Sequence, residues 1–118
     1  MAESTVHGGC HCGAVRYTTT IDLASESIHC NCSMCGRAGT LLSFVPAAKF
    51  TIDQGADSLS VYKFNKHVID HLFCKVCGIK PFSRGKGPHG DMVAVNMRTI
   101  DDIDQFAIPA KQFDGKSR

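Results

Sequence analysis

The sequence predicts an all-β or β-dominated fold made of short strands, with few or no long helices. Short segments rich in β-branched and aromatic residues, some alternating between apolar and polar side chains, are typical of strands. Glycine, proline and asparagine separate these segments at close intervals. No window of a dozen or more residues shows the 3.6-residue periodicity of an amphipathic helix.

In the first half of the chain we expect strands at residues 14–20, 27–30, 39–45 and 50–52. Ser33 is expected to cap a single turn after the second of these strands. Pro46 should end the third strand, because proline cannot donate to a strand ladder. One helical turn at residues 47–50 and a turn at residues 54–57 are expected to follow.

In the second half we expect strands at residues 58–64, 67–73, 79–83 and 91–97. The first two should pair as a hairpin through a turn at Asn65 and Lys66. Residues 84–90 are mostly glycine, proline and charged residues, which predicts a loop. The tail after Met97 contains too many apolar residues for a disordered end.

Length and composition predict one domain spanning residues 1–118. The chain is 43% hydrophobic and 20% charged, which is ordinary for a globular protein. The formal net charge is +2 and the basic residues are scattered, so no nucleic-acid partner is expected. The most apolar stretch, residues 41–48, is far shorter than the roughly 20 residues that cross a bilayer, and no membrane association is expected.

The chain contains seven cysteines, which is the one unusual count in its composition. An odd number, tight spacings and the lack of an apolar signal core at the start disfavour a secreted disulfide framework. We therefore expect a reducing cytoplasm, in which the thiols are kept for metal binding.

The cysteines form two pairs and one triplet: Cys10 and Cys12, Cys74 and Cys77, and Cys30, Cys32 and Cys35. In a C-x-C pair on an extended backbone, both thiols point to one face. Two pairs and a triplet suggest one closed four-thiolate site and one three-thiolate site. Spacing alone leaves open which groups join, although combining the two pairs is the most economical division because it leaves the triplet whole.

A zinc ion with three protein ligands and one open position is the pattern of catalytic zinc sites. His29 and His11 adjoin cysteines and are candidates for a fourth ligand, but neighbours on a strand face opposite sides, which favours their pointing away. The alternative to metal binding is a set of free buried cysteines acting as small apolar side chains.

Three motifs occur in order along the chain: GCHCGAVRY at residues 9–17, CNCSMC at residues 30–35 and FCKVCG at residues 73–78. Together with VNMR at residues 95–98 and FDG at residues 113–115, they resemble the glutathione-dependent formaldehyde-activating enzyme family. The resemblance runs from about residue 8 to residue 115. It implies small twisted antiparallel sheets held by zinc, in the arrangement called a β-tent.

The resemblance also implies two zinc ions with different roles. A structural zinc is expected at Cys10, Cys12, Cys74 and Cys77, and a catalytic zinc at Cys30, Cys32 and Cys35. The family reaction joins formaldehyde to the thiol of glutathione, and its enzymes are classed as carbon–sulfur lyases.

The leading hypothesis is therefore a zinc-dependent carbon–sulfur lyase acting on a small thiol, such as glutathione, and an aldehyde. Arg84, His89 and Arg98 are candidates for binding a substrate carboxylate, because arginine recognises such groups bidentately. The alternative hypothesis is a non-enzymatic zinc-binding module that uses the same fold for protein–protein interaction. It predicts that a protein side chain fills the fourth place at the cysteine triplet, or that the site is empty or cannot be reached by solvent.

Overall fold

A computed structural model of the chain describes residues 3–63, 69–87 and 90–117. The strands are β1 (Ser4–Gly9), β2 (Arg16–Ile21), β3 (Ser27–Cys30), β4 (Leu42–Pro46), β5 (Phe50–Gln54), β6 (Leu59–Tyr62), β7 (Asp70–Cys74), β8 (Phe82–Gly87), β9 (Gly90–Asn96) and β10 (Ala110–Phe113). The helical segments are α1 (Ser33–Ala38) and the 3₁₀ turns η1 (Ala47–Lys49), η2 (Ala56–Ser58), η3 (Met97–Thr99), η4 (Gln105–Ala107) and η5 (Gly115–Ser117). The predicted β-dominated class without long helices is confirmed.

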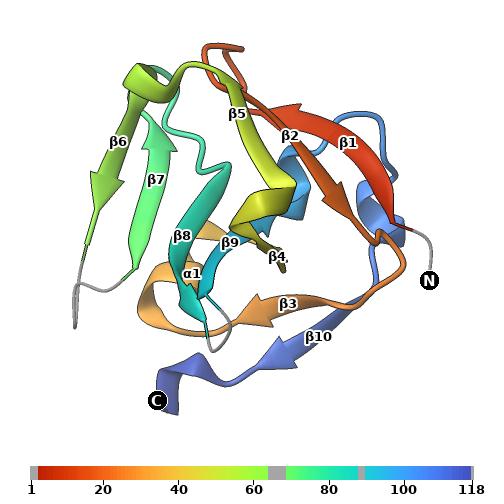
Figure 1. Cartoon of the computed structure of the whole chain (residues 1–118). Helices are drawn as coiled ribbons and strands as arrows, with labels where there is room; N and C mark the ends of the chain where they lie inside the picture. Colours follow the sequence, from red (N-terminus) through yellow and green to blue (C-terminus); the bar gives the residue numbers. More distant parts are fainter. Residues whose placement is uncertain (1–2, 64–68, 88–89, 118) are drawn as a thin grey trace.

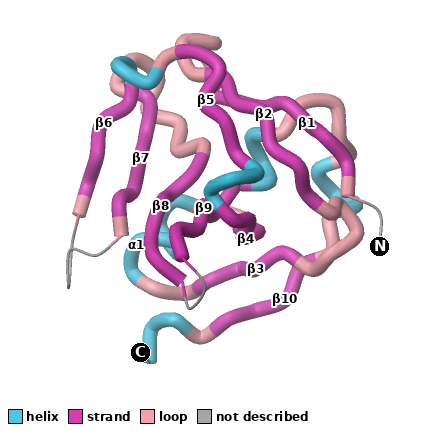
Figure 2. Tube along the Cα trace, viewed as in Figure 1, coloured by secondary structure: helices cyan, strands magenta, loops and turns pink. Residues whose placement is uncertain are grey.

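The strands form two sheets (Figure 1). One is three-stranded with the order β1-β2-β5, and the other is seven-stranded with the order β10-β3-β4-β9-β8-β7-β6. Nearly all neighbours pair antiparallel, but β10 runs parallel to β3, with Ala110 opposite Ser27 and Phe113 opposite Cys30 (Figure 2). Parallel partners cannot be joined by a tight turn, and here the chain from β4 to β9 lies between β3 and β10. The sequence did not predict this parallel pair.

The main apolar core lies between the two sheets. Tyr17 of β2 stacks on Phe50 of β5 with ring centroids 5.0 Å apart, and Phe50 contacts Phe82 of β8 at 4.6 Å. Tyr17 and Phe82 are fully buried. Aromatic pairs of this kind stabilise beyond the area they bury, by about 0.5–1.5 kcal/mol each. These rings join the three-stranded sheet to the middle of the seven-stranded one.

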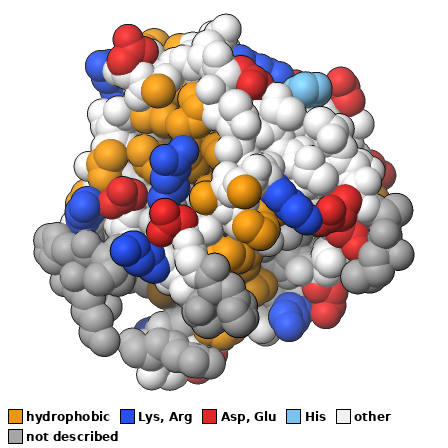
Figure 3. All heavy atoms as spheres, in the orientation of Figure 1, with side chains coloured by type: hydrophobic (Ala, Val, Ile, Leu, Met, Phe, Trp, Pro, Cys, Tyr) orange, Lys and Arg blue, Asp and Glu red, His pale blue; other side chains and the backbone are white. Residues whose placement is uncertain are grey.

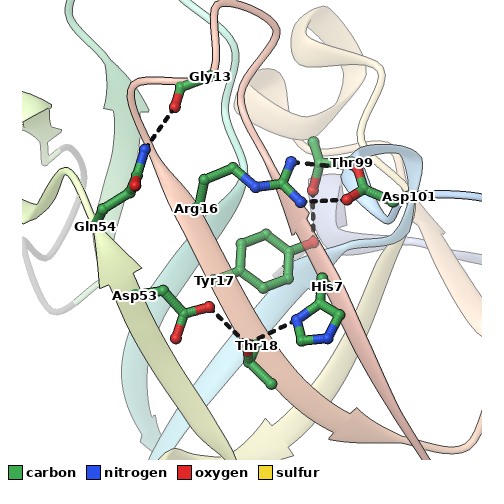
Figure 4. Close-up of polar contacts among 9 residues, drawn as sticks. All are labelled: His7, Gly13, Arg16, Tyr17, Thr18, Asp53, Gln54, Thr99 and Asp101. Carbon is green, nitrogen blue, oxygen red and sulfur yellow. Dashed lines mark hydrogen bonds and ion pairs between the residues drawn. The ribbon is translucent and has the colours of Figure 1, made fainter.

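Polar contacts join β2 to the end of β9 (Figure 4). The guanidinium of Arg16 forms an ion pair with Asp101, just beyond η3. The hydroxyl of Tyr17 lies 2.8 Å from Oγ1 of Thr99. Burial raises the pKa of Tyr17 to about 12, so this hydroxyl stays protonated at neutral pH.

The prediction of a loop at residues 84–90 is wrong for the described residues, 84–87 and 90, which are strand. Strand β8 continues to Gly87, and its residues pair with β9 from Arg84 opposite Val93 to Gly87 opposite Gly90. Local composition predicted a loop, but pairing with a neighbouring strand outweighs the weak strand propensity of glycine.

Other boundaries also differ from the expectations. Strand β1 was not predicted. Residues 79–81 were expected to begin a strand, but β8 starts only at Phe82. Cys32, rather than Ser33, is the N-cap of α1. The hairpin pairing of β6 with β7 is confirmed, whereas the turn expected at Asn65 and Lys66 lies outside the described residues.

Charged side chains of both signs are scattered over the face drawn in Figure 3, which agrees with their scatter along the sequence. Within the part of the chain that the structure describes, none of the helices has the length and apolar character needed to cross a membrane.

Candidate metal centres

Four thiols from two distant hairpin ends meet at one point, which we call the four-thiol cluster. Cys10 and Cys12 lie in the connection between β1 and β2, whereas Cys74 ends β7 and Cys77 lies in the turn after it. The four Sγ atoms all lie within 4.8 Å of one another. The cluster therefore links the three-stranded sheet to the seven-stranded sheet.

Backbone geometry sets up the four-thiol cluster. The amide of Val15 donates to Sγ of Cys10 at 3.3 Å, and the amide of Val76 donates to Sγ of Cys74 at 3.4 Å. Gly78 has a φ of 81°, a left-handed conformation that lets the chain turn tightly behind Cys77. Amide donors aimed at sulfur stabilise the thiolate form that metal binding requires.

The sulfur separations at the four-thiol cluster fit a zinc ion. Sγ of Cys12 lies 3.6 Å from that of Cys10 and 3.7 Å from that of Cys74. A tetrahedral site with zinc–sulfur bonds of about 2.3 Å places its sulfurs about 3.8 Å apart. Hydrogen bonds from the backbone amides of Ile79 and Cys12 lower the pKa of Cys77 to about 6. Four converging thiols with these donors are suited to a closed zinc site.

The second group, which we call the three-thiol cluster, lies where β3 passes into α1. The Sγ atoms of Cys30, Cys32 and Cys35 lie within 4.8 Å of one another. Helix α1 starts here because Cys32 has an extended backbone and its sulfur accepts from the amide of Cys35 at 3.3 Å. The helix ends at Gly39, which has a left-handed φ of 68°. The end of β3, the N-cap and the first turn of α1 thus place the three thiols together.

The thiols of the three-thiol cluster differ in their surroundings. Cys35 is buried, and burial raises its pKa to about 12. Burial acts to raise the pKa of Cys32, but hydrogen bonds from the amides of Cys35 and Met34 and from the neighbouring thiols together outweigh burial and lower it. Metal binding requires thiolates, so a cation bound between these sulfurs would favour loss of the proton from Cys35 as well.

The three-thiol cluster lies on the outer face of the seven-stranded sheet, away from the main core. Leu42 of β4 and Ala94 of β9 pack against Cys35. The neighbours of Ala94 in the strand, Val93 and Val95, belong to the main core. Because successive side chains of a strand alternate between faces, Ala94 and the cluster occupy the opposite face.

The C-terminal segment closes one side of the three-thiol cluster through Asn31, a residue between two of the cysteines. Its side-chain amide donates to Oδ1 of Asp114 at 3.0 Å, and its Oδ1 accepts from the amide of Lys116 at 2.9 Å. Its own amide donates to the carbonyl of Phe113 at 3.2 Å. Sequence analysis missed this role of Asn31, because the partners are more than eighty positions away.

Gly115 lies directly against the three-thiol cluster. A Cβ atom at this position would stand 2.5 Å from Sγ of Cys30 and 3.4 Å from Cβ of Cys32. The missing side chain leaves space beside the sulfur, and three converging thiols supply soft ligands. The residues present therefore fit a zinc ion with three protein ligands.

The remaining candidates are the two histidines next to cysteines in the sequence and the three residues expected to bind substrate. His11 and His29 are exposed, and neither joins the groups of potential ligands formed by the described residues. The guanidinium of Arg84 lies over the ring of Phe82, 5.6 Å from its centroid, and so on the core face of β8. Arg98 is exposed on η3, and His89 lies outside the described residues. The substrate-binding role of these side chains stays a prediction.

The two clusters and the two sheets define a class of small β-sheet proteins with paired cysteine sites suited to metal. The family model described as glutathione-dependent formaldehyde-activating enzyme matches residues 5–116, and the chain belongs to this family. The resemblance noted in the sequence is thereby confirmed. A crystal structure of a Rhodobacter sphaeroides protein is similar, with a TM-score of 0.77 and 24% identity, covering 89% of this chain and 99% of that one. That likeness shows the fold.

Proposed function

We propose that the protein is a zinc-dependent carbon–sulfur lyase that forms or cleaves the adduct of formaldehyde with a small thiol such as glutathione. The observation that carries this proposal is the division of the seven cysteines. Four thiols form one group and three form another, and no histidine, aspartate or glutamate of the described residues joins the group of three. A three-ligand zinc site leaves room for a substrate.

We assign two zinc ions, one structural at the four-thiol cluster and one catalytic at the three-thiol cluster. When bound at Cys30, Cys32 and Cys35, zinc supplies a positive charge that favours the thiolate form of a substrate thiol. Three thiolate ligands already donate much charge to the ion. The site is therefore better suited to activating the substrate thiol than to activating water.

The chain's own residues supply binding and exclusion of water. Cys30, Cys32 and Cys35 hold the site, while Leu42 and Ala94 line it with apolar surface. Gly115 packs directly against Cys30 and covers one side of the cluster, where a Cβ would stand 2.5 Å from the sulfur. In the addition, a sulfur–carbon bond forms as the carbonyl π bond opens, and the proton lost from the thiol ends on the oxygen.

We also propose a cytoplasmic setting, since all seven cysteines are free thiols and metal binding requires them reduced. The single domain expected from the sequence remains part of the proposal. Arg98 remains a candidate for binding a substrate carboxylate, whereas the placement of Arg84 over Phe82, on the core face, does not favour a role at the three-thiol cluster.

The test is adduct formation by the zinc-loaded protein with glutathione and formaldehyde, followed by loss of free formaldehyde and corrected for the spontaneous reaction. We expect a rate above the spontaneous one that disappears in Cys35→Ser with the four-thiol zinc retained. No rate above the spontaneous reaction, with both zinc ions present, would contradict the enzymatic proposal and favour the non-enzymatic binding module.

A further inference from the structure

Lys80, between the Cys77 turn and β8, holds its side-chain amine in a fixed place. Its Nζ donates to Oγ of Ser83 at 2.6 Å. Its carbonyl accepts from Nδ2 of Asn96 at 2.9 Å, so the backbone is anchored as well. Ser83 and Asn96 are buried and Lys80 is half-buried. A long flexible side chain with both ends held is preorganised for binding.

The amine of Lys80 lies on the same sheet face as the three-thiol cluster. Ser83 pairs directly opposite Ala94, and residues directly opposite each other in antiparallel strands share a face. Ala94 packs against Cys35. Burial lowers the pKa of Lys80, while the nearby thiols of Cys35 and Cys32 act to raise it. Through Ser83 and Ala94, the amine therefore lies on the side of the sheet that carries the cluster.

The ammonium of Lys80 has binding capacity that the described residues do not use. A lysine ammonium has three N–H donors, and among these residues one goes to Ser83. None of the three ion pairs of the described residues involves Lys80. Charges removed from water are usually paired. A half-buried cation with free donors next to a ligand site is suited to an anion.

We propose that Lys80 is a substrate-binding residue whose ammonium binds an anionic oxygen of the ligand held at the three-thiol cluster. The oxygen belongs either to a carboxylate of the thiol substrate or to the aldehyde, whose oxygen gains negative charge as the thiol adds. This assignment rests on the proposed function. Hydrogen bonding to either oxygen leaves the atom and electron balance of the addition unchanged.

A first experiment reads anion binding without turnover. Zinc-loaded protein carrying ¹³C at lysine Cε is titrated with sodium acetate at constant ionic strength and followed by NMR, with Lys80→Arg used to assign the resonance. We expect a saturable shift of Lys80 and none of Lys86, which is exposed on the core-side face of β8. An unmoved Lys80 resonance, or an equal shift of Lys86, overturns the proposal.

A second experiment compares Lys80→Met with Lys86→Met in adduct formation. Loss of a charged hydrogen bond should weaken the affected parameter roughly 10- to 100-fold. A raised KM for glutathione with unchanged kcat identifies the thiol carboxylate as the partner. A lowered kcat with unchanged KM identifies the aldehyde oxygen. The Lys86 variant should match the parent protein in both.

Unchanged kinetics in Lys80→Met overturn the proposal, and so does loss of metal from its three-thiol cluster, which would mean that Lys80 serves the metal site instead. If the parent protein shows no catalysis at all, the proposed function fails. The acetate titration still decides the role of Lys80 in that case, because it depends on no reaction.

Discussion

Gly115 shows how one absent side chain can define a site. A Cβ at this position would stand 2.5 Å from Sγ of Cys30, which is closer than a side chain can approach without displacing its neighbour. Glycine fits here because it has no Cβ. The φ of Gly115 is not positive, so backbone conformation is not what requires glycine at this position. Any larger residue must push the C-terminal segment away from the thiols or occupy the space beside Cys30.

We predict that Gly115→Ala impairs metal binding at the three-thiol cluster. The added methyl group would stand 2.5 Å from Sγ of Cys30, well inside van der Waals contact. Metal binding is measured by cobalt substitution and the absorption of the cobalt–thiolate complex. The affinity for one of the two bound metal ions should fall at least about tenfold, while the melting temperature stays close to that of the parent.

Gly36→Ala is the matched control, because Gly36 directly follows Cys35 on α1 and its Cβ would meet no atom closer than 3.8 Å. It should keep both metals and gain at most about 1 kcal/mol of stability from the better helix former. Normal cobalt binding by Gly115→Ala would show that this space is not needed.

We predict that the Arg16–Asp101 pair adds stability that depends on pH. Its hydrogen bond from Arg16 lowers the pKa of Asp101 in the folded state. A lowered carboxyl pKa stabilises the fold above the unfolded pKa of about 4, and this gain is lost as pH falls through the folded pKa. With side chains 33% and 41% exposed, the pair should contribute no more than about 1 kcal/mol.

A double-mutant cycle with Arg16→Gln and Asp101→Asn, followed by urea unfolding, measures this contribution at pH 7 and at lower pH. The coupling free energy should shrink as the solution is acidified. A coupling that grows towards acid pH would contradict the assigned sign.

At the scale of elements, β3, α1 and β10 form one unit around the three-thiol cluster. Strand β3 delivers Cys30, the cap of α1 supplies Cys32, and β10 lies parallel to β3 and leads into Gly115. Asn31 ties these pieces together with contacts to Asp114 and to the amide of Lys116. Its place between two cysteines couples the C-terminal segment to the site.

We predict that Asn31→Ala loosens the C-terminal segment while leaving the rest of the fold intact. Two hydrogen bonds to exposed partners are lost, each contributing about 0.5–1.5 kcal/mol. Amide hydrogen exchange at Lys116 should speed up roughly tenfold, whereas exchange in β8 and β9 should not change.

Gln112→Ala, an exposed substitution on β10, is the control and should leave Lys116 exchange unaltered. Equal protection of Lys116 in the parent and in Asn31→Ala would show that strand pairing alone holds the segment.

At the scale of the whole molecule, the two thiol clusters have different structural positions. The four-thiol cluster joins ligands from the β1–β2 connection to ligands at the end of β7, and so bridges both sheets. The three-thiol cluster lies within residues 30–35, on the face away from the main core. A metal ion at the first cluster cross-links distant segments, whereas one at the second restrains a short loop.

We predict that Cys74→Ser unfolds the protein and that Cys30→Ser does not. Structural zinc contributes about 10 kcal/mol or more of apparent binding free energy, and its loss would leave the sheets joined by the apolar core and the polar contacts of β2 with Thr99 and Asp101. Circular dichroism and zinc stoichiometry measure both effects. Equal unfolding by the two substitutions would contradict the division between a structural and a catalytic site.

Much of the fold and of the candidate site could be predicted from local sequence patterns. The strand at residues 27–30, the hairpin partners β6 and β7, and the grouping of thiols by C-x-C and C-x-x-C spacing are all short-range features, which strand alternation and tight turns determine locally. The loop predicted at the end of β8 was wrong, because that feature depends on a long-range contact: its glycines form a strand only when β9 lies beside them.

The sequence by itself determined the class of fold, the local groups of cysteines and the family, because these depend on residue types and short spacings. Only the tertiary structure decided which sulfurs meet, that Gly115 and Asn31 face the three-thiol cluster, and that Lys80 rather than Arg84 shares its sheet face. These relations depend on strand pairing between distant segments. A shift of one residue in the strand register would move each side chain to the opposite face of the sheet, and the sequence alone does not specify that register.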